Sequence, residues 1–280
     1  MTRGQALAAA TERLAGLSAT PRLDAELLMA HALGVTREAL LLGGLAAPAP
    51  EDFGALVERR LAHEPIAYIT GTRGFWTIEL AVGPGALVPR PDSETLIEAA
   101  AAHFAGGPGP TRILDLGTGS GALLLAALDE WPGASGIGID ASPAARSWAA
   151  RNAEALGMAA RAEICDGGWT GTGERFDLIL CNPPYIGTGE TLPRDVAAWE
   201  PASALFAGAD GLDDYRAIAP VLAPQLAPGG VACIEIGCTQ AMTAGALFEA
   251  EGFDVVVRRD LGGRDRCLVV THKRKSADFT

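Results

Sequence analysis

The sequence predicts an α/β protein in which a small all-helical part precedes a larger part built on a mostly parallel sheet. Two observations carry this prediction. From about residue 92 onward, short apolar runs alternate with helical segments, which is the rhythm of parallel strands joined by helices. Residues 1–73 are instead predicted to be helical, with Leu7, Leu14 and Leu17 recurring at helical spacing.

The helical part contains recognisable helix start and stop signals. Thr20-Pro21 is typical of a helix N-terminus, and Gly34 is expected to end that helix. Thr36 can cap the next helix, and Glu51-Asp52 begins a further one. We therefore expect residues 1–73 to form a helical domain without a catalytic group of its own.

Residues 74–91 differ in character from the segments on either side. Phe75–Val82 is aromatic and β-branched, Gly83-Pro84-Gly85 predicts a turn, and Ala86–Val88 is apolar again. We expect a β-hairpin linker here.

Residues 92–280 are predicted to form the sheet domain. Buried apolar runs separated by helices favour a sheet that is covered on both faces. The two last runs flank a polar turn and are expected to form an antiparallel hairpin. The predicted strands are 112–116, 135–139, 162–165, 178–181, 231–236, 253–257 and 267–270.

Length, composition and charge limit the class of protein. The chain has 280 residues, 49% hydrophobic and 20% charged, which suits two folded domains and argues against disorder. Its 34 acidic residues outnumber 22 basic ones, giving a net charge of −12. A protein that binds phosphate backbones normally carries clustered Lys and Arg, so no direct contact with nucleic acid is expected.

The cysteines and the N-terminal segment indicate the cellular compartment of the protein. None of the five cysteines forms a C-x-x-C pair, and four lie in predicted strands, as expected for reduced, buried thiols rather than a metal site. The N-terminus lacks an uninterrupted apolar signal segment, and no apolar run reaches the roughly 20 residues that span a bilayer. We expect a cytoplasmic, monomeric protein with no metal and no membrane partner.

A glycine-rich turn follows the first predicted strand of the sheet domain. Its residues are Gly117, Thr118, Gly119, Ser120 and Gly121, and a helix follows directly. Glycines there let the backbone approach a ligand, and the helix start offers free N–H groups. The third glycine comes one residue too early for the dinucleotide fingerprint G-x-G-x-x-G. Taken alone, the turn is equally consistent with a purely structural role.

Acidic residues end the next two strands. Asp140 stands where a carboxylate can accept both hydroxyls of a ribose, although it can also be the N-cap of the helix predicted from Ser142. Asp166 can accept a hydrogen bond from an adenine amino group, and Trp169 can lie against the ring. A loop acid that caps a turn is an equal alternative for Asp166.

The fourth strand ends in Asn182-Pro183-Pro184-Tyr185. The lone pair of an amide nitrogen is delocalised, so such a nitrogen is methylated only if its NH₂ group is well oriented. The Asn182 side-chain oxygen and the Pro183 carbonyl can each accept one of its hydrogens. Pro184 and Pro183 hold the backbone in a fixed geometry, and Tyr185 offers a flat face to a planar substrate.

Together these motifs resemble the Rossmann-like class I S-adenosyl-L-methionine-dependent methyltransferases, in the branch whose fourth motif is Asp/Asn/Ser-Pro-Pro-aromatic. The resemblance implies that Gly117–Gly121 and Asp140 bind S-adenosyl-L-methionine, with contributions from Asp166, Trp169 and Asn182. It also implies that Asn182 and Pro183 orient the nitrogen acceptor, while Tyr185 packs against it.

Further segments resemble one family of this branch, the peptide chain release factor glutamine methyltransferases. They are Glu64–Gly71 with Gly74-Phe75-Trp76, Pro89–Glu94, and Glu200–Leu212. The resemblance covers about residues 20–270 and implies methylation of the glutamine in the Gly-Gly-Gln loop of release factors. It also implies that the helical domain over residues 1–73 recognises the substrate.

One departure and several alternatives remain. The family often has an adjacent Asp-Trp pair after the third strand, whereas Gly167-Gly168 separates Asp166 from Trp169 here. For Asp92 and Glu94, a purely structural role as negative charges near the N-terminus of the following helix is an alternative. The competing functions are an RNA or DNA amino methyltransferase and a ribosomal-protein glutamine methyltransferase. A nicotinamide-dependent dehydrogenase does not explain the Asn182 motif.

Overall fold

The computed structural model describes residues 1–273 and divides them into two compact units. The helical unit comprises Met1–Thr72, Val82–Pro84 and Leu192–Glu200, and the sheet unit comprises Arg73–Ala81, Gly85–Thr191 and the described residues from Pro201 to position 273. The α/β fold class predicted from the sequence is confirmed. Within the described residues, no helix is both long and apolar enough to cross a bilayer.

The helical unit packs its N-terminal helices around leucines and alanines. Two predicted signals are confirmed, because Thr36 caps α3 through its hydroxyl and Gly34 ends α2 at a φ of 63°. Thr20 and Asp52 precede α2 and α4 as predicted, but neither side chain makes a capping hydrogen bond. Leu7, Leu14 and Leu28 are fully buried in its core. The helices are α1 (Arg3–Leu14), α2 (Pro21–Leu33), α3 (Arg37–Gly43), α4 (Phe53–Leu61) and α5 (Ile66–Thr70).

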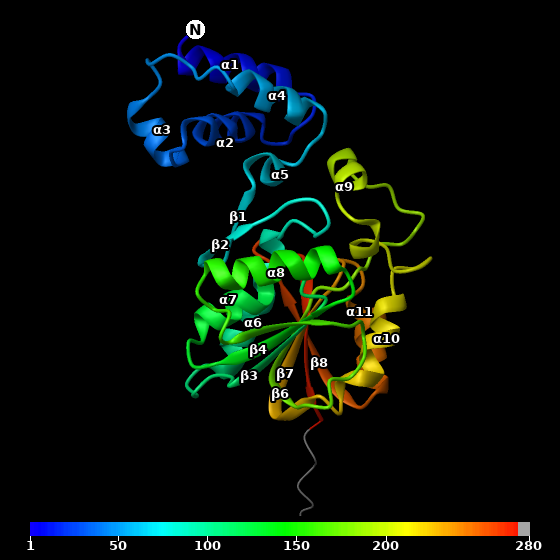
Figure 1. Cartoon of the computed structure of the whole chain (residues 1–280). Helices are drawn as coiled ribbons and strands as arrows, with labels where there is room; N and C mark the ends of the chain where they lie inside the picture. The colour runs from blue at the N-terminus through cyan, green and yellow to red at the C-terminus, as the bar shows by residue number, and fades with distance from the viewer. Residues whose placement is uncertain (274–280) are drawn as a thin grey trace, which may run out of the picture. The chain divides into compact units, whose positions relative to one another are not determined.

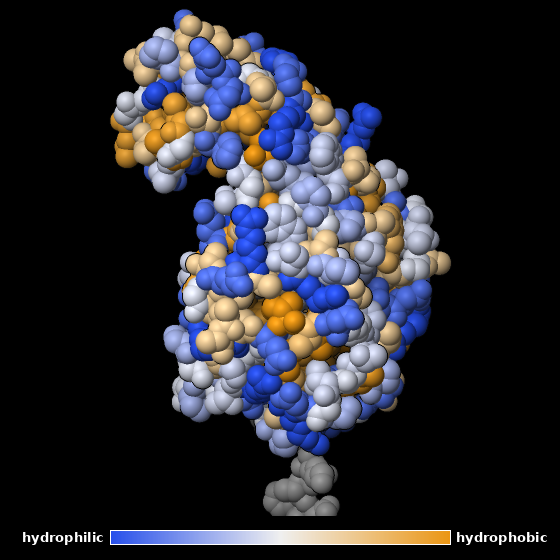
Figure 2. Space-filling view, in the orientation of Figure 1, coloured by the Kyte–Doolittle hydropathy of each residue, from blue (hydrophilic) through white to orange (hydrophobic). Residues whose placement is uncertain are grey.

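Helix α9 (Arg194–Trp199) also belongs to the helical unit, and the sequence did not predict it. It has only 6 residues and none of them is buried, so it is too short to show the apolar periodicity that signals a helix. Arg60 connects it to α2: its guanidinium lies 2.9 Å from the Asp24 carboxylate and 3.6 Å from that of Asp195. Figure 2 shows hydrophobic patches between hydrophilic residues on this unit.

The hairpin after the helical segments lies earlier than predicted. Strands β1 (Thr72–Phe75) and β2 (Ile78–Ala81) pair with each other, and the turn between them is at Trp76 and Thr77 rather than at Gly83-Pro84-Gly85. Ala86–Val88 forms no strand. Trp76 takes a φ of 53°, unusual for a residue with a side chain, and tertiary contacts hold it. Its N–H donates to the Glu94 carboxylate at 2.9 Å.

Within the described residues, the sheet unit contains a seven-stranded sheet in the order β5-β4-β3-β6-β7-β9-β8. Strands β3 to β7 run parallel, and β9 is antiparallel to both β7 and β8, which confirms the predicted closing hairpin. The strands are β3 (Arg112–Leu116), β4 (Ser135–Asp140), β5 (Ala162–Asp166), β6 (Phe176–Cys181), β7 (Leu226–Glu235), β8 (Phe253–Arg259) and β9 (Asp265–His272).

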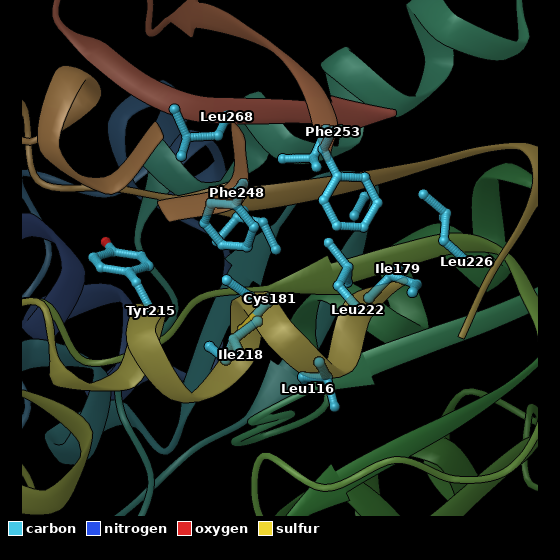
Figure 3. Packing of buried hydrophobic residues seen from close by; sticks show 14 of the residues in the cluster. Leu116, Ile179, Cys181, Tyr215, Ile218, Leu222, Leu226, Phe248, Phe253 and Leu268 are labelled. Atoms are coloured by element: carbon cyan, nitrogen blue, oxygen red, sulfur yellow. The ribbon is translucent and has the colours of Figure 1, made fainter. Parts of the chain in front are cut away.

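Helices cover both faces of this sheet, as Figure 1 shows: α6, α7 and α8 lie on one side, and α10 and α11 on the other. On the second side, Tyr215, Ile218 and Phe248 pack against β6, β7 and β9 (Figure 3). The helical elements are η1 (Pro91–Ser93), α6 (Glu94–Phe104), α7 (Ala122–Glu130), α8 (Pro143–Ala155), η2 (Ala202–Ala204), α10 (Asp213–Leu222) and α11 (Ala241–Ala250).

The strand order places a ligand crevice at the end of β3. The chain passes from β3 to β4 on one side and later returns to β6 on the other, so the connections diverge at that strand. In open α/β sheets, ligands bind outside the carboxyl ends of strands at such a switch point. The glycine turn, Asp140 and Asn182 follow β3, β4 and β6, and thus meet at this edge.

Ser142 is the N-cap of α8, with its hydroxyl accepting the Ala145 N–H at 3.3 Å. We predict that Ser142→Ala lowers the free energy of unfolding by about 1 kcal/mol, as expected for losing a helix cap. Urea denaturation followed by circular dichroism measures the change. A loss above about 3 kcal/mol would mean that Ser142 has a further structural role.

Candidate active site

A cavity of about 270 Å³ lies at the carboxyl ends of the parallel strands in the sheet unit. It contains the expected nucleoside-binding and acceptor-binding residues side by side. The predicted residues that line it are Gly117, Thr118, Gly119, Ser120, Asp140, Trp169, Asn182 and Pro184. Gly121, Asp166, Pro183 and Tyr185 are not among its lining residues within the described chain.

The glycine turn takes a backbone shape that side chains would obstruct. Gly117 and Gly121 have φ values of 71° and 85°, in the left-handed region that favours glycine. A Cβ on Gly117 would lie 3.0 Å from the Trp169 ring, and one on Gly121 would lie 3.3 Å from the Ala149 backbone. The glycines therefore let the turn pack tightly against both Trp169 and α8.

Asp115 anchors this turn from below, a role that the sequence did not reveal. Its carboxylate accepts the Thr118 hydroxyl at 2.6 Å and the Leu124 N–H at 3.2 Å, and so connects the turn to the start of α7. Complete burial raises the pKa of Asp115 to about 7, although both hydrogen bonds lower it. An acid inside an otherwise apolar strand was the available signal, because buried carboxylates are rare without partners.

Asp140 holds two backbone groups that flank the cavity. Its Oδ2 accepts the Gly119 N–H at 2.9 Å, and its Oδ1 accepts the Ser142 N–H at 2.8 Å. Because Ser142 itself caps α8, the alternative reading of Asp140 as the helix cap is wrong. An ionised carboxylate has about four acceptor positions, so each oxygen of Asp140 keeps capacity for one more donor.

Asp166 and Trp169 are held by polar partners near this edge. The largely exposed Asp166 carboxylate forms an ion pair with Arg146, which also donates to the Asp140 carbonyl at 2.7 Å. The Trp169 indole N–H donates to the Asp214 carboxylate, which fixes the ring that lines the cavity. Arg146 and Asp214 lack a sequence motif that would have singled them out.

The Asn182 segment is held by partners from elements far apart in the chain. The Asn182 Nδ2 group donates to the Ser93 hydroxyl at 3.1 Å, at the start of α6. The Tyr185 hydroxyl donates to Glu235 Oε1 at 3.2 Å, and burial next to that carboxylate raises the pKa of Tyr185. The backbone carbonyl of Tyr185 accepts from Gln240 at 2.9 Å.

The loop after α9 runs alongside this segment. Ile186 exchanges backbone hydrogen bonds with Leu205 and Ala207, each at 3.0 Å, which forms an isolated parallel bridge to Phe206. Pro201, Ser203 and Ala204 from this loop line the cavity. The loop that resembled the family in sequence is therefore part of the cavity wall.

Two segments of the chain match known protein families. Residues 5–71 match the PrmC N-terminal domain, and residues 92–198 match the methyltransferase small domain. The ribosomal protein L11 methylase from Lactobacillus delbrueckii subsp. bulgaricus aligns with a TM-score of 0.51 at 21% identity, over 69% of this chain and 84% of that one. This likeness shows the fold alone.

Full-length relatives are more similar. The release factor glutamine methyltransferase of Rhodospirillum rubrum is 45% identical over 260 residues, covering 90% of this chain and 79% of that protein. That of Cereibacter sphaeroides is 45% identical over 279 residues, covering 96% of this chain and 98% of that protein. The family resemblance inferred from the motifs is thereby confirmed, and the chain belongs to the release factor glutamine methyltransferase family.

Proposed function

We propose that the protein methylates the side-chain amide nitrogen of the glutamine in the Gly-Gly-Gln segment of peptide chain release factors, using S-adenosyl-L-methionine. The observation that carries the proposal is the position of Asn182 in the wall of a nucleoside-sized cavity. The side chain proposed to bind the substrate amide and the glycine-rich turn proposed to bind the cofactor thus line the same cavity. Family membership supports the choice of a release factor glutamine over other nitrogen acceptors.

The cavity residues fit S-adenosyl-L-methionine. Asp140 keeps acceptor capacity for two ribose hydroxyls. A Cβ on Gly117 would contact the Trp169 ring, and Gly119 has open space beside it, so the turn leaves its backbone accessible to a ligand. Trp169 offers a flat apolar face beside the turn. When bound there, the cofactor supplies an electrophilic methyl group on a sulfonium. Asp166 as an adenine acceptor stays a prediction, since its carboxylate is paired with Arg146.

Asn182 and Pro183 do the orienting work in this proposal. The Asn182 side-chain oxygen and the Pro183 carbonyl each accept one hydrogen of the substrate NH₂ group, which directs the nitrogen lone pair at the methyl group. The nitrogen becomes acidic once methylated, so its proton leaves to water without a dedicated base. Tyr185 is proposed to border the substrate glutamine, held in place through its hydroxyl and carbonyl.

The remaining parts of the proposal concern partners. We assign residues 1–73 to release factor recognition. The net charge of −12 disfavours a nucleic-acid substrate and favours a cationic protein loop. The free cysteines suit a reducing compartment, and we propose a monomer that acts in the cytoplasm with the translation machinery.

A labelling experiment tests the substrate. The enzyme is incubated with methyl-labelled S-adenosyl-L-methionine and either a release factor or its Gly-Gly-Gln→Gly-Gly-Ala variant. We expect label on the unaltered factor and background label on the variant, with mass spectrometry placing one methyl group on the glutamine. Equal labelling of both proteins, or label on added RNA instead, would refute the assignment.

A further inference from the structure

A buried carboxylate lies behind Asn182, outside the lining of the cavity. Glu235 ends β7, is 1% exposed, and receives the Tyr185 hydroxyl on Oε1. Its other oxygen, Oε2, has no hydrogen-bond partner among residues 1–273. An unpartnered buried carboxylate oxygen costs free energy, so such a group calls for an explanation beyond packing.

Ser93 stands between this carboxylate and Asn182. Its hydroxyl accepts the Asn182 Nδ2–H at 3.1 Å, and Ser93 lies close enough to Glu235 to lower the pKa of that carboxyl group. Ser93 is 3% exposed and also borders the cavity. The three side chains come from η1, the end of β6 and the end of β7.

The direction of hydrogen bonding in this series matters because the two ends of an amide have nearly the same shape. Asn182 can turn either Nδ2 or Oδ1 toward Ser93, and its other end then faces the cavity. A hydroxyl has one hydrogen. If that hydrogen is directed at an ionised Glu235, which can only accept, Ser93 can only accept from Asn182.

We propose that Glu235 is a positioning residue that acts through Ser93 to keep the Nδ2 group of Asn182 turned inward, so that Oδ1 faces the substrate amide. The inference rests on the proposed function, since the inward donor is useful only if Oδ1 must accept from a substrate NH₂ group. It also gives the Pro89–Glu94 segment a physical task, because that segment carries the hydroxyl at position 93.

The ionisation of Glu235 is therefore coupled to the orientation of Asn182. Burial raises the pKa of Glu235 to about 7, opposed by Ser93, Arg266 and Tyr185. Below that pH the carboxylic acid can donate to Ser93, and the Ser93 hydroxyl can then donate to Asn182 Oδ1. The side-chain amide of Asn182 therefore rotates, and its Nδ2 group faces the substrate instead of Oδ1. Activity should fall as pH falls through about 7 and be full above it. The charged and titratable groups around Glu235 are Asp92, Cys181, Tyr185, Tyr215, Arg266 and Cys267.

Two variants of the full-length protein test the positioning role by kinetics. Glu235→Gln keeps the shape but can either donate to or accept from Ser93, and Ser93→Ala removes the intermediate hydroxyl. We expect each to lower kcat about tenfold at a pH near 8, the effect of losing one directional hydrogen bond, with KM for the cofactor unchanged. Ser93→Thr should restore kcat, and the fall in activity near pH 7 should vanish in Glu235→Gln.

Asp177→Asn is the matched structural control. Its carboxylate accepts the Thr111 and Arg112 N–H groups at the opposite end of β6, at 2.9 and 3.1 Å. We expect this variant to lose stability while keeping kcat and the pH profile. The pKa of Asp115, whose carboxylate accepts from Thr118, is also raised to about 7. If Asp115 caused the fall in activity near pH 7, that fall would persist in Glu235→Gln, so the pH profile of this variant distinguishes the two carboxylates.

A measurement without substrate separates this inference from the proposed function. The side-chain NH₂ signals of Asn182, assigned by their loss in Asn182→Ala, are followed by ¹⁵N NMR across the pH range around 7. We expect them to shift with pH in the unaltered protein and to stay constant in Glu235→Gln. Constant signals in the unaltered protein, or an unchanged pH profile and kcat in Glu235→Gln, would overturn the positioning role even if release factors are methylated.

Discussion

Replacing Asn182 with alanine is expected to lower kcat by roughly 10³-fold while cofactor affinity stays within about threefold. The reason is geometric. The wall of the cavity loses the only side-chain oxygen that we assign to the substrate NH₂ group, and an amide nitrogen without orientation is a poor nucleophile. The substitution leaves Asp140 and the glycine turn, to which we assign the cofactor, in place.

Single-turnover methylation of a release factor measures the chemical step, and isothermal titration calorimetry measures cofactor binding. Asn182→Asp is the matched variant, since it keeps an oxygen at that position but cannot donate to the Ser93 hydroxyl as Nδ2 does. We expect it to fall between the alanine variant and the unaltered enzyme. Near-normal turnover in Asn182→Ala would remove Asn182 from the mechanism.

Asp140→Ala is expected to weaken cofactor binding by at least about 10²-fold. Hydrogen bonds to a charged carboxylate contribute about 1.5 to 3 kcal/mol each, and two ribose hydroxyls would lose their acceptor. The variant also leaves the N–H groups of Gly119 and Ser142 without their carboxylate partner. Both consequences act on the cofactor side of the cavity.

Calorimetric titration with S-adenosyl-L-homocysteine measures this loss, and Ser142→Ala is the control. That variant removes the helix cap but leaves the carboxylate of Asp140, so its affinity should stay within about threefold of the unaltered protein. If Asp140→Ala binds as tightly as the unaltered protein, the ribose is held elsewhere. If both variants lose affinity equally, α8 rather than the carboxylate governs binding.

Much of the sheet unit was predictable because its signals are local. The central predicted parallel strands are buried apolar runs, and such runs stand out wherever helices separate them, as in Arg112–Leu116, predicted with the observed bounds. The edge strand β5 buries only Ala162. The site was predictable for a related reason. Parallel strands bring their carboxyl ends to one edge, so residues after successive strands meet there without further information.

Local sequence signals predicted the wrong position for the hairpin turn and did not predict helix α9. Gly83-Pro84-Gly85 has turn composition, yet the hairpin turns at Trp76, whose left-handed backbone is held by Glu94 from α6. Helix α9 has only 6 residues, none of them buried, which is too short for an apolar period to be recognised. In both places, contacts with residues distant in the chain outweighed local composition.

The class of fold, the family and most of the residues that line the cavity could be predicted from the chain's residues alone, because each of these depends on short segments in a fixed order. How those residues are held depends on the folded structure. Ser93 and Asn182 are 89 positions apart, and Tyr185 is 50 positions from Glu235. Which side chains meet across such separations follows from strand order and packing, and no local pattern in the chain records it.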